Sequence, residues 1–570
     1  MKNVKTLTKF TSIVSIYLTC FILVCFSTQS NIEEDSIYIN QVKSFIADFD
    51  LDISDQVNPK FNYILTKNLA HPSHHSISQS SSILASIGIF ELVTFFLNIN
   101  QVETYRFALM FLSFFNILIG FLILKSALKN SFEFSAKDVI LFILSSPFFY
   151  YSFISLSTLE VFLFPFSSLL VFFLLNEKTK LSVFDSFCLG LASSTLFSSK
   201  ESFLPIVICL SIYLWIKKSY KLSYFILGLL PPFIAKLIHT YFIYGDLVFV
   251  NGIIGNIVND FSLNNISETI IYGFFSLNGL LGAFPLLFIL AIFVTIKAFK
   301  NSLFKDGFEI FFYLLWILIG LLQTFFLVGP YLEDLFYGRH LMIAMPPIFI
   351  LYLKFKRSIS TKRYLLIMSI LILFSMYSTL SFCTQYQLSH YNYIADKYLI
   401  QIQPLINQLT QVAHDMLEVL QNNFLSIAII AFVYLILFKL LIFIKARFNI
   451  IIFFQYYQIT MAFFLLLLVS VSAYNLSQRD LSYNQEKFKN TIITDNSYFY
   501  PFTYVMDFFR AQYIATNRKA TRIKINTKRK EYYKKIKNTA IQKNKSFENE
   551  LENLNFDIDY YYNESLGSKN

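Results

Sequence analysis

Long apolar runs recur along most of the chain, each about 17 to 25 residues long, which is the length a helix needs to cross roughly 30 Å of hydrocarbon. Little charge separates them. Only 15% of the 570 residues are charged, whereas a typical soluble protein has about 25%. A soluble protein with so many helices that are apolar on every side would have too little polar surface to stay dissolved. The sequence therefore predicts an all-α polytopic membrane protein.

The first apolar run, residues 10–27, follows three lysines and has two interpretations. A basic start, an apolar core and small residues near the end are typical of a cleaved signal peptide. We expect a retained first span instead, because many spans follow and no clear Ala-x-Ala pattern ends the run.

Clusters of Lys and Arg fall on every second connection between the apolar runs. Because basic residues concentrate in cytosolic loops, these clusters place the N-terminus inside. The alternation predicts about 13 transmembrane helices, with the C-terminus outside. The basic connections are residues 125–137, 177–180, 217–221, 297–305, 354–363 and 445–447.

Two apolar stretches do not fit as simple spans. Residues 81–99 contain Glu91 and begin with a crowd of serines, and counting them as a span would invert every later loop. We expect them to form a helix that lies in, or dips into, the outer interface. Residues 386–422 have apolar residues at helical spacing, which suits an amphipathic helix on the outer face.

The composition changes after residue 474. Residues 475–570 are polar and partly basic, with tyrosines among the lysines of residues 517–538. Two interpretations fit this tail: contact with anionic lipid or phosphate-rich glycan, or a solvated, partly disordered segment on the outer face. Nucleic acid is a poor partner there. The chain thus divides into a transmembrane core (residues 1–364), C-terminal transmembrane helices (365–474) and the tail.

The first outer loop, residues 29–79, is rich in groups that bind metals or protons. Its carboxylates and imidazoles include Glu33, Glu34, Asp35, His71, His74 and His75. Such side chains are ligands for Mn²⁺, Mg²⁺ or Zn²⁺, and the loop has enough of them for a site of three or four ligands. The ordinary alternative is a hydrophilic loop that carries charge because it lies in water.

Five motifs follow one another on the predicted outer face. They are the acidic pair Glu34–Asp35 with Tyr38 after it, HPSHH (71–75), LSSPFFYYSFISLSTLEVFLFPF (144–166), LGLASSTLFSSKESFLP (189–205) and GRHLMIAMPP (338–347). In order and sidedness they resemble the motifs of the GT-C superfamily. These are polytopic glycosyltransferases that use polyprenyl-phosphate sugars, and they include the protein O-mannosyltransferase and lipid A aminoarabinose transferase families. The resemblance covers about the first 350 residues.

The resemblance implies a GT-C-like core in which a sugar passes from a polyprenyl-phosphate donor to a hydroxyl of a protein, lipid or glycan. Glu34 or Asp35 would be the catalytic base, and the other would help to hold a divalent metal beside His71, His74 or His75. The first residue of the acidic pair is commonly Asp in the family and is Glu34 here, so both residues remain candidates.

The resemblance also implies that Lys200, Arg339 and His340 bind the lipid phosphate, because they stand at the outer ends of spans, where such a phosphate would lie. The alternative for Lys200 and Arg339 is snorkelling, in which a long basic side chain lifts its charge to the interface. Glu160 is a costly charge if it is buried in lipid. It would orient the acceptor, pair with Lys200 or be an ordinary link residue.

A multispan transporter or flippase for a lipid-linked saccharide is the competing class. Carriers place ionisable groups near the midplane, often in internal repeats, whereas here mid-span charges are few. A non-catalytic subunit of the same fold is a third alternative. The membrane would be the plasma (inner) membrane in a bacterium or the endoplasmic reticulum in a eukaryote. Sequons at Asn265 and Asn475 do not decide between these, because such triplets are common.

Overall fold

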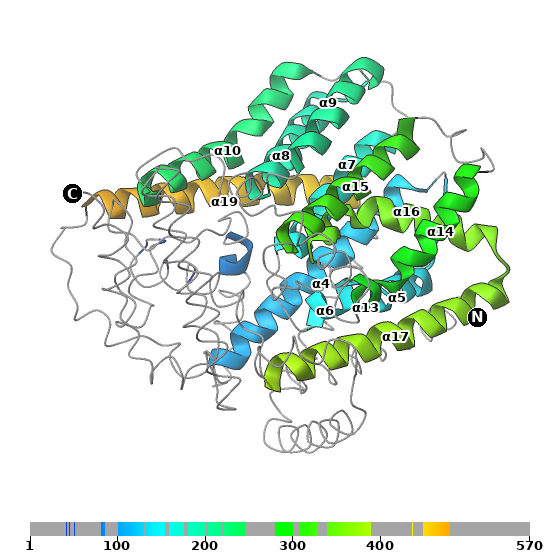
Figure 1. The fold of residues 1–570 in the computed structure, drawn as a ribbon. Helices are drawn as coiled ribbons and strands as arrows, with labels where there is room; N and C mark the ends of the chain where they lie inside the picture. The colour runs from blue at the N-terminus through cyan, green and yellow to red at the C-terminus, as the bar shows by residue number, and fades with distance from the viewer. Residues whose placement is uncertain are drawn as a thin grey trace, which may run out of the picture.

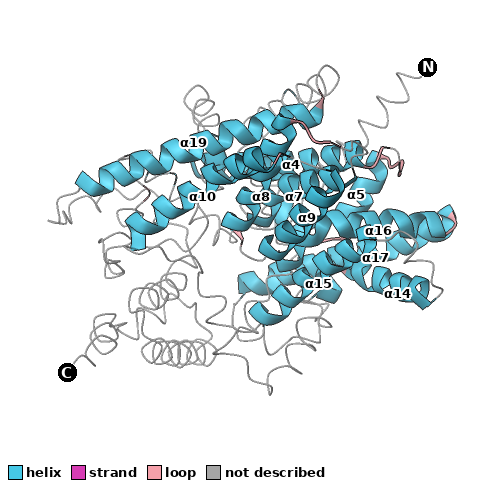
Figure 2. Ribbon diagram, turned by 90° about the horizontal axis from the view of Figure 1, so that it is seen from above, coloured by secondary structure: helices cyan, strands magenta, loops and turns pink. Residues whose placement is uncertain are grey.

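The computed structural model of the protein describes residues 81–85, 101–129, 131–153, 159–175, 180–200, 203–218, 221–244, 280–299, 308–328, 339–388 and 449–478, together with Val42, Phe45, Phe49, Leu51 and Ile436. Within this part of the chain every regular element is a helix and no strand occurs (Figures 1 and 2). The predicted all-α class therefore holds for the described residues. The predicted number of spans also involves residues outside these ranges and stays a prediction.

The described helices are mostly long. In chain order they are α4 (Gln101–Ala127), α5 (Ala136–Leu144), α6 (Phe148–Phe153), α7 (Leu159–Leu175), α8 (Val183–Ser199), α9 (Leu204–Lys218), α10 (Leu222–Tyr244), α13 (Leu280–Ala283), α14 (Pro285–Phe299), α15 (Phe308–Val328), the 3₁₀ helix η7 (Arg339–Ala344), α16 (Met345–Ser358), α17 (Thr361–Leu388) and α19 (Ile450–Gln478). Local signals explain several helix starts: Ser135 and Ser182 are the N-caps of α5 and α8, and prolines stand in the first turn of α16.

Among the described residues, two helices are long and apolar enough to cross a membrane, over Leu222–Tyr241 in α10 and Ile450–Asn475 in α19. Shorter apolar helical segments accompany them: Leu112–Ala127, Leu159–Leu175, Leu204–Ile216, Pro285–Lys297 and Phe312–Leu322. The two long segments coincide with runs that the sequence predicts to be spans, each starting after a basic connection.

An aromatic cluster holds the centre of the bundle together. The ring of Phe121 in α4 makes edge-to-face contacts with Phe142 of α5, Phe148 of α6, Phe164 of α7 and Phe349 of α16, with centroids 5.0 to 6.1 Å apart. All of these rings are buried. The cluster thus fixes α4, α5, α7 and α16 relative to one another, although α16 comes from a distant part of the chain.

Helices α8 and α10 approach each other backbone to backbone. A Cβ atom at Gly190 would collide with the carbonyl oxygen of Phe225, and one at Gly228 would collide with that of Phe187. Ser194 Oγ donates to a carbonyl oxygen of α10 at 2.6 Å. Small residues at a close helix contact, with a hydroxyl bonded across it, are typical of helix pairs in membranes.

Helix α19 lies against α4, α8 and α10 (Figure 1). It also packs against residues 81–85, which are helical and mostly buried, because Ser82 Oγ and Tyr457 Oη share a hydrogen bond of 3.1 Å. These residues are the described part of the predicted interfacial helix 81–99. The other predicted interfacial helix, 386–422, is described only where α17 ends.

Candidate functional site

The structure describes only some of the predicted site residues with their side chains. Glu34, Asp35, His71, His74 and His75 lie outside the described residues, so their roles as base and metal ligands stay predictions. Arg339 and His340 begin η7, but their side chains lie outside the described residues. Lys200 and Glu160 are both described, and the fold brings them together.

Glu160 and Lys200 form a buried ion pair, which we call the α7–α8 pair. Lys200 Nζ donates to Glu160 Oε1, and the two side chains are 9% and 1% exposed, respectively. Pairing with Lys200 was one of the roles that the sequence left open for Glu160. The pair ties the start of α7 to the end of α8.

The position of each charge follows from the helix that carries it. Glu160 lies in the first turn of α7, and Lys200 is the residue that ends α8, so each charge stands where the helix dipole favours its sign. Residues 176–182 join the other ends of these two helices, which therefore run in opposite directions side by side. Antiparallel packing brings the acidic helix start next to the basic helix end.

Buried polar atoms without partners occur beside the pair. The Oγ atoms of Ser198 and Ser199, directly before Lys200, have no hydrogen-bond partner in the described part of the chain. After Lys200 the chain turns, and the ring of Phe203 meets Trp316 of α15 with centroids 6.3 Å apart. The indole Nε1 of Trp316 is buried and likewise unpaired. Such atoms are rare in folded proteins, and a bound ligand or water would satisfy them.

The GRHLMIAMPP motif reaches the same group of helices. Its η7 turn lies against α7, which carries Glu160, and against α15, which carries Trp316. Leu341 and Ala344 of η7 face Gly320 of α15. The helix η7 begins with Arg339 and His340, and its backbone is packed against both α7 and α15.

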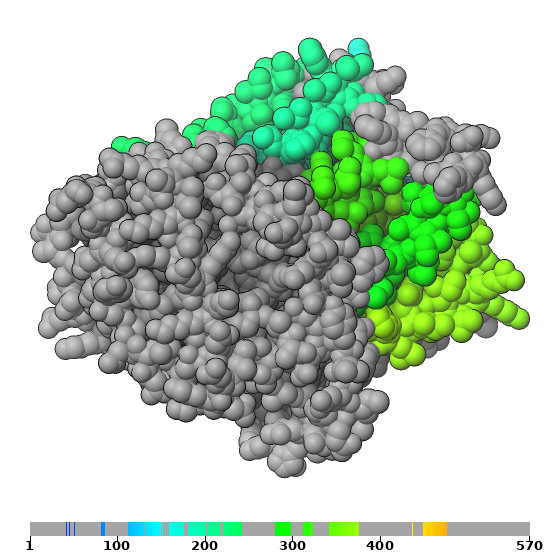
Figure 3. All heavy atoms as spheres, in the orientation of Figure 1, coloured from blue at the N-terminus to red at the C-terminus, as the bar shows by residue number. Residues whose placement is uncertain are grey.

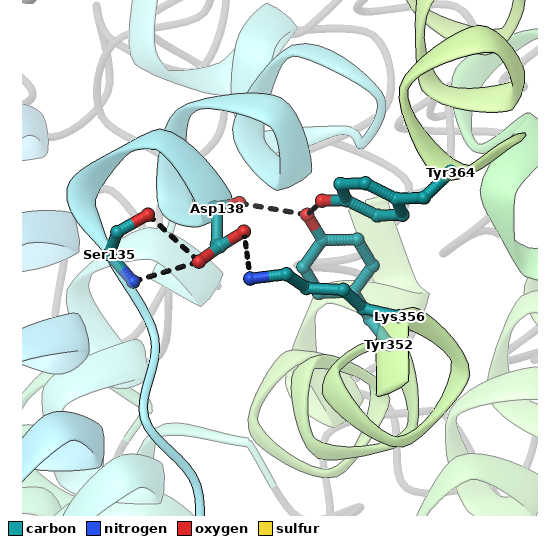
Figure 4. A network of polar contacts seen from close by, with 5 residues as sticks. All are labelled: Ser135, Asp138, Tyr352, Lys356 and Tyr364. Atoms are coloured by element: carbon teal, nitrogen blue, oxygen red, sulfur yellow. Dashed lines mark hydrogen bonds and ion pairs between the residues drawn. The ribbon is translucent and has the colours of Figure 1, made fainter. Parts of the chain in front are cut away.

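A second buried carboxylate belongs to Asp138 in α5. Ser135 donates its backbone N–H and its Oγ to Asp138 Oδ2 at 2.8 and 2.9 Å, and Lys356 Nζ pairs with Oδ1 at 2.7 Å (Figure 4). Tyr352 Oη donates to the backbone carbonyl of Asp138 at 3.1 Å and shares a hydrogen bond with Tyr364 Oη. We call these five residues the α5–α16 cluster. Both oxygens of the carboxylate are bonded within it.

Sequence reasoning missed the α5–α16 cluster. The Ser-x-x-Asp spacing of Ser135 and Asp138 is the capping-box pattern and was visible in the sequence. The tyrosine that bonds Asp138 lies 214 residues further along the chain, and no spacing rule connects the two.

The described residues contain no group of three His, Cys, Asp or Glu side chains that could hold a metal ion. The metal ligands that the sequence predicts all lie elsewhere in the chain. The divalent metal therefore stays a prediction of the sequence.

The charges of the α7–α8 pair determine what it can bind. While Lys200 contacts Glu160, each charge neutralises the other. An anion that replaced Glu160 beside Lys200 would bind the ammonium in surroundings of low dielectric constant, where the attraction is strong. It would also leave the carboxylate of Glu160 next to a second negative charge, which is unfavourable.

No family model, curated protein or solved structure matches the chain.

Proposed function

We propose that the protein is a multi-pass membrane glycosyltransferase of the GT-C type. It would move a sugar from a polyprenyl-phosphate donor to a hydroxyl of a protein, lipid or glycan on the non-cytosolic face. The α7–α8 pair supports this best, because Glu160 and Lys200 come from two separate motifs of the GT-C resemblance and are buried together. Burying two charges costs much desolvation free energy, so a buried ion pair is weak evidence that the pair stabilises the fold. Its presence among apolar helices therefore favours a functional site.

The outward surface of the helices supports a location in the membrane. Large apolar side chains are exposed at helical spacing on α9, α10, α14, α15, α17 and α19. On α9, for example, Leu204, Ile208, Ile212 and Ile216 are all exposed. Figure 3 shows α9 and α10 in teal and α14, α15 and α17 in green at the surface of one face. Such continuous apolar stripes are unfavourable in water and suit contact with lipid.

The α5–α16 cluster supports the proposed orientation. It joins the ends of two connections that the sequence predicts to be cytosolic, residues 125–137 and 354–363. In addition, the guanidinium of Arg357 lies over the ring of Phe132, 4.3 Å from its centroid. The α7–α8 pair instead stands at the helix ends away from the basic connection 177–180. This arrangement fits a site that faces away from the cytosol.

In the proposed reaction the acceptor oxygen attacks the anomeric carbon, and the bond between that carbon and the phosphate oxygen breaks. Glu34 or Asp35 takes the proton of the acceptor hydroxyl. The lipid phosphate leaves with the bonding electron pair, and Lys200, Arg339 and His340 stabilise the charge that develops on it.

Glu160 neutralises the buried charge of Lys200 in the resting protein. When Lys200 turns to the phosphate, the carboxylate accepts a hydrogen bond from the acceptor hydroxyl. A divalent metal (Mn²⁺, Mg²⁺ or Zn²⁺) held by His71, His74 and His75 with Glu34 or Asp35 is an expectation from the sequence, and we assign no step to it.

The proposal is tested by incubating the purified full-length protein with radiolabelled polyprenyl-phosphate sugars, with and without chelator. The measured quantity is the free polyprenyl phosphate that is released. We expect Lys200→Ala to lower kcat by about 100-fold, as for loss of one group that stabilises developing charge. Either Glu34→Gln or Asp35→Asn should abolish turnover. Lys356→Ala is the matched control, because Lys356 also pairs with a buried carboxylate, and it should keep most of the activity.

Two results together would contradict the proposal. If the protein turns over no donor, and the Glu34 and Asp35 variants keep their cellular function, the protein is not this enzyme. A transporter or flippase for a lipid-linked saccharide would then be the better proposal.

A further inference from the structure

Five exposed basic side chains gather around the α5–α16 cluster. We call them the basic face: Lys129, Lys137, Arg357, Lys362 and Arg363. Three of the five stand directly beside cluster members in the chain, next to Asp138, Lys356 and Tyr364. The contacts of the cluster join α5 to α16 and α16 to α17 (Figure 4). The cluster therefore brings together basic residues from two distant parts of the chain.

Little negative charge offsets the basic face. Residues 125–140 and 351–370, which contain it, have eight basic side chains and two acidic ones, Glu133 and Asp138. Asp138 is buried, and its carboxylate is neutralised within the cluster. Glu133 is thus the one exposed carboxylate in these two stretches. The surface keeps a strong positive charge, which predicts an anionic partner.

An aromatic ring supports Arg357 at this surface. Arg357 lies in the last turn of α16, and its guanidinium is 4.3 Å from the ring centroid of Phe132. Phe132 is half-buried, whereas Arg357 is exposed. A guanidinium that rests on a ring has less freedom to lose on binding, and its planar set of N–H donors matches two oxygens of a phosphate at once. This arrangement therefore favours a phosphate group as the anion.

The basic face borders directly on apolar surface. The first turn of α17 carries Lys362 and Arg363, and large exposed apolar side chains follow on the same helix at Leu366, Ile370 and Leu373. Exposed apolar side chains of this kind suit contact with hydrocarbon. Basic residues at the end of such a helix lie at the level of the lipid headgroups. The neighbouring apolar surface therefore favours a phospholipid over a soluble anion as the partner.

We propose that the basic face binds the phosphate of an anionic phospholipid in the cytosolic leaflet, with Arg357 donating to the phosphate oxygens. The inference rests on the proposed membrane location and orientation, and it does not depend on glycosyl transfer. Basic residues at a cytosolic face are expected of any membrane protein. That rule does not require them to converge on one buried framework, nor a guanidinium to rest on a ring. The α5–α16 cluster is then the framework of a lipid site.

The site is tested first by thermal unfolding of the purified full-length protein in a neutral detergent. Phosphatidylglycerol is titrated in, with phosphatidylcholine and soluble glycerol phosphate in parallel. A ligand that binds only the folded state raises Tm as its concentration rises. We expect this rise with phosphatidylglycerol, and we expect the other two compounds to leave Tm nearly unchanged. No rise with phosphatidylglycerol, or an equal rise with either of the other compounds, would overturn the lipid site.

The half-saturating concentration of phosphatidylglycerol then locates the site. Arg357→Gln should raise it about five-fold, as for loss of one basic group beside an anionic headgroup. Phe132→Leu keeps every charge and should raise it too, because the guanidinium loses its support. Lys221→Gln is the matched control and should match the wild type. Lys221 is also exposed, its Nζ lies 6.0 Å from the ring centroid of Tyr224, and it belongs to another connection that the sequence predicts to be cytosolic.

Two results with these variants would contradict a defined site. An equal loss of binding in Lys221→Gln would mean that the lipid is attracted diffusely by all the basic connections. Unchanged binding in Arg357→Gln or in Phe132→Leu would mean that the guanidinium on its ring does not hold the phosphate.

The lipid site and the glycosyltransferase proposal fail separately. Donor turnover by a protein that shows no preference for phosphatidylglycerol would overturn the lipid site and leave the glycosyltransferase proposal standing. A preference that depends on Arg357, in a protein that turns over no donor, would overturn the glycosyltransferase proposal alone.

Discussion

The α7–α8 pair and the α5–α16 cluster each bury a carboxylate beside a lysine, but their surroundings differ. Asp138 is 4% exposed and Lys356 is 34% exposed, so this lysine keeps contact with solvent, and Ser135 bonds the other carboxylate oxygen. Glu160 and Lys200 are 1% and 9% exposed. The complete network suits a structural clasp between helices. The α7–α8 pair is more deeply buried, and the two serines directly before Lys200 have Oγ atoms without a hydrogen-bond partner among the described residues, which suits a site that takes up a ligand.

The largest expected effect is that of Lys200→Met. This change removes the ammonium that pairs with the buried carboxylate of Glu160 and should cost about 3 to 5 kcal/mol in the free energy of unfolding. The double variant Lys200→Met/Glu160→Gln removes both charges and should regain most of that stability, while its turnover should stay as low as that of the single variant. Thermal unfolding in detergent and donor turnover measure the two effects. A double variant as unstable as the single one would show that the pair is itself stabilising, which would make it resemble the α5–α16 cluster.

Asp138→Asn should have a smaller effect, about 1 to 3 kcal/mol in the free energy of unfolding. The change weakens the hydrogen bonds from Ser135, but the ammonium of Lys356 reaches water and stays solvated. Turnover per folded molecule should stay at the wild-type value, since the cluster has no proposed catalytic role. The folded fraction is measured by size-exclusion chromatography beside the activity. A fall in turnover that exceeds the loss of folded protein would contradict the structural assignment.

Tyr352→Phe tests how far the α5–α16 cluster acts as one unit. Loss of the hydroxyl should cost about 0.5 to 1.5 kcal/mol in the free energy of unfolding. Because its oxygen bonds both the carbonyl of Asp138 and the hydroxyl of Tyr364, the effects of Tyr352→Phe and Tyr364→Phe should not add. A double-mutant cycle in thermal unfolding measures this coupling. Simple additivity would mean that the hydroxyls do not form a network.

The smallest expected change in stability is that of Ser199→Ala. Its hydroxyl is buried and unpaired, so its removal should leave the free energy of unfolding within about 0.5 kcal/mol or raise it slightly. Donor turnover should nevertheless fall if the hydroxyl contacts the bound ligand. Ser135→Ala is the matched change in the other region and should cost about 1 kcal/mol as a lost cap. Equal stability losses at the two serines would remove the distinction between the regions.

The two regions also differ in how well the sequence predicts them. Glu160 and Lys200 stand out in the sequence, because a charge at the end of an apolar helix is costly and therefore noticeable. Their mutual pairing was only one of the roles left open, since each also had a plausible role alone. The capping serine of α5 was equally visible in principle, but the partners of Asp138 on α16 were not, because they follow no local pattern.

The sequence by itself determined the helical character of the described residues. An apolar helix satisfies its backbone polar groups within its own segment, so its length and caps can be read from neighbouring residues. Only the tertiary structure decided that Lys200 pairs with Glu160, that Lys356 pairs with Asp138, and that Leu51 bonds Ser472 across 421 positions. Such partners depend on which helix ends meet in space, and this follows from the packing of the whole bundle rather than from any local spacing.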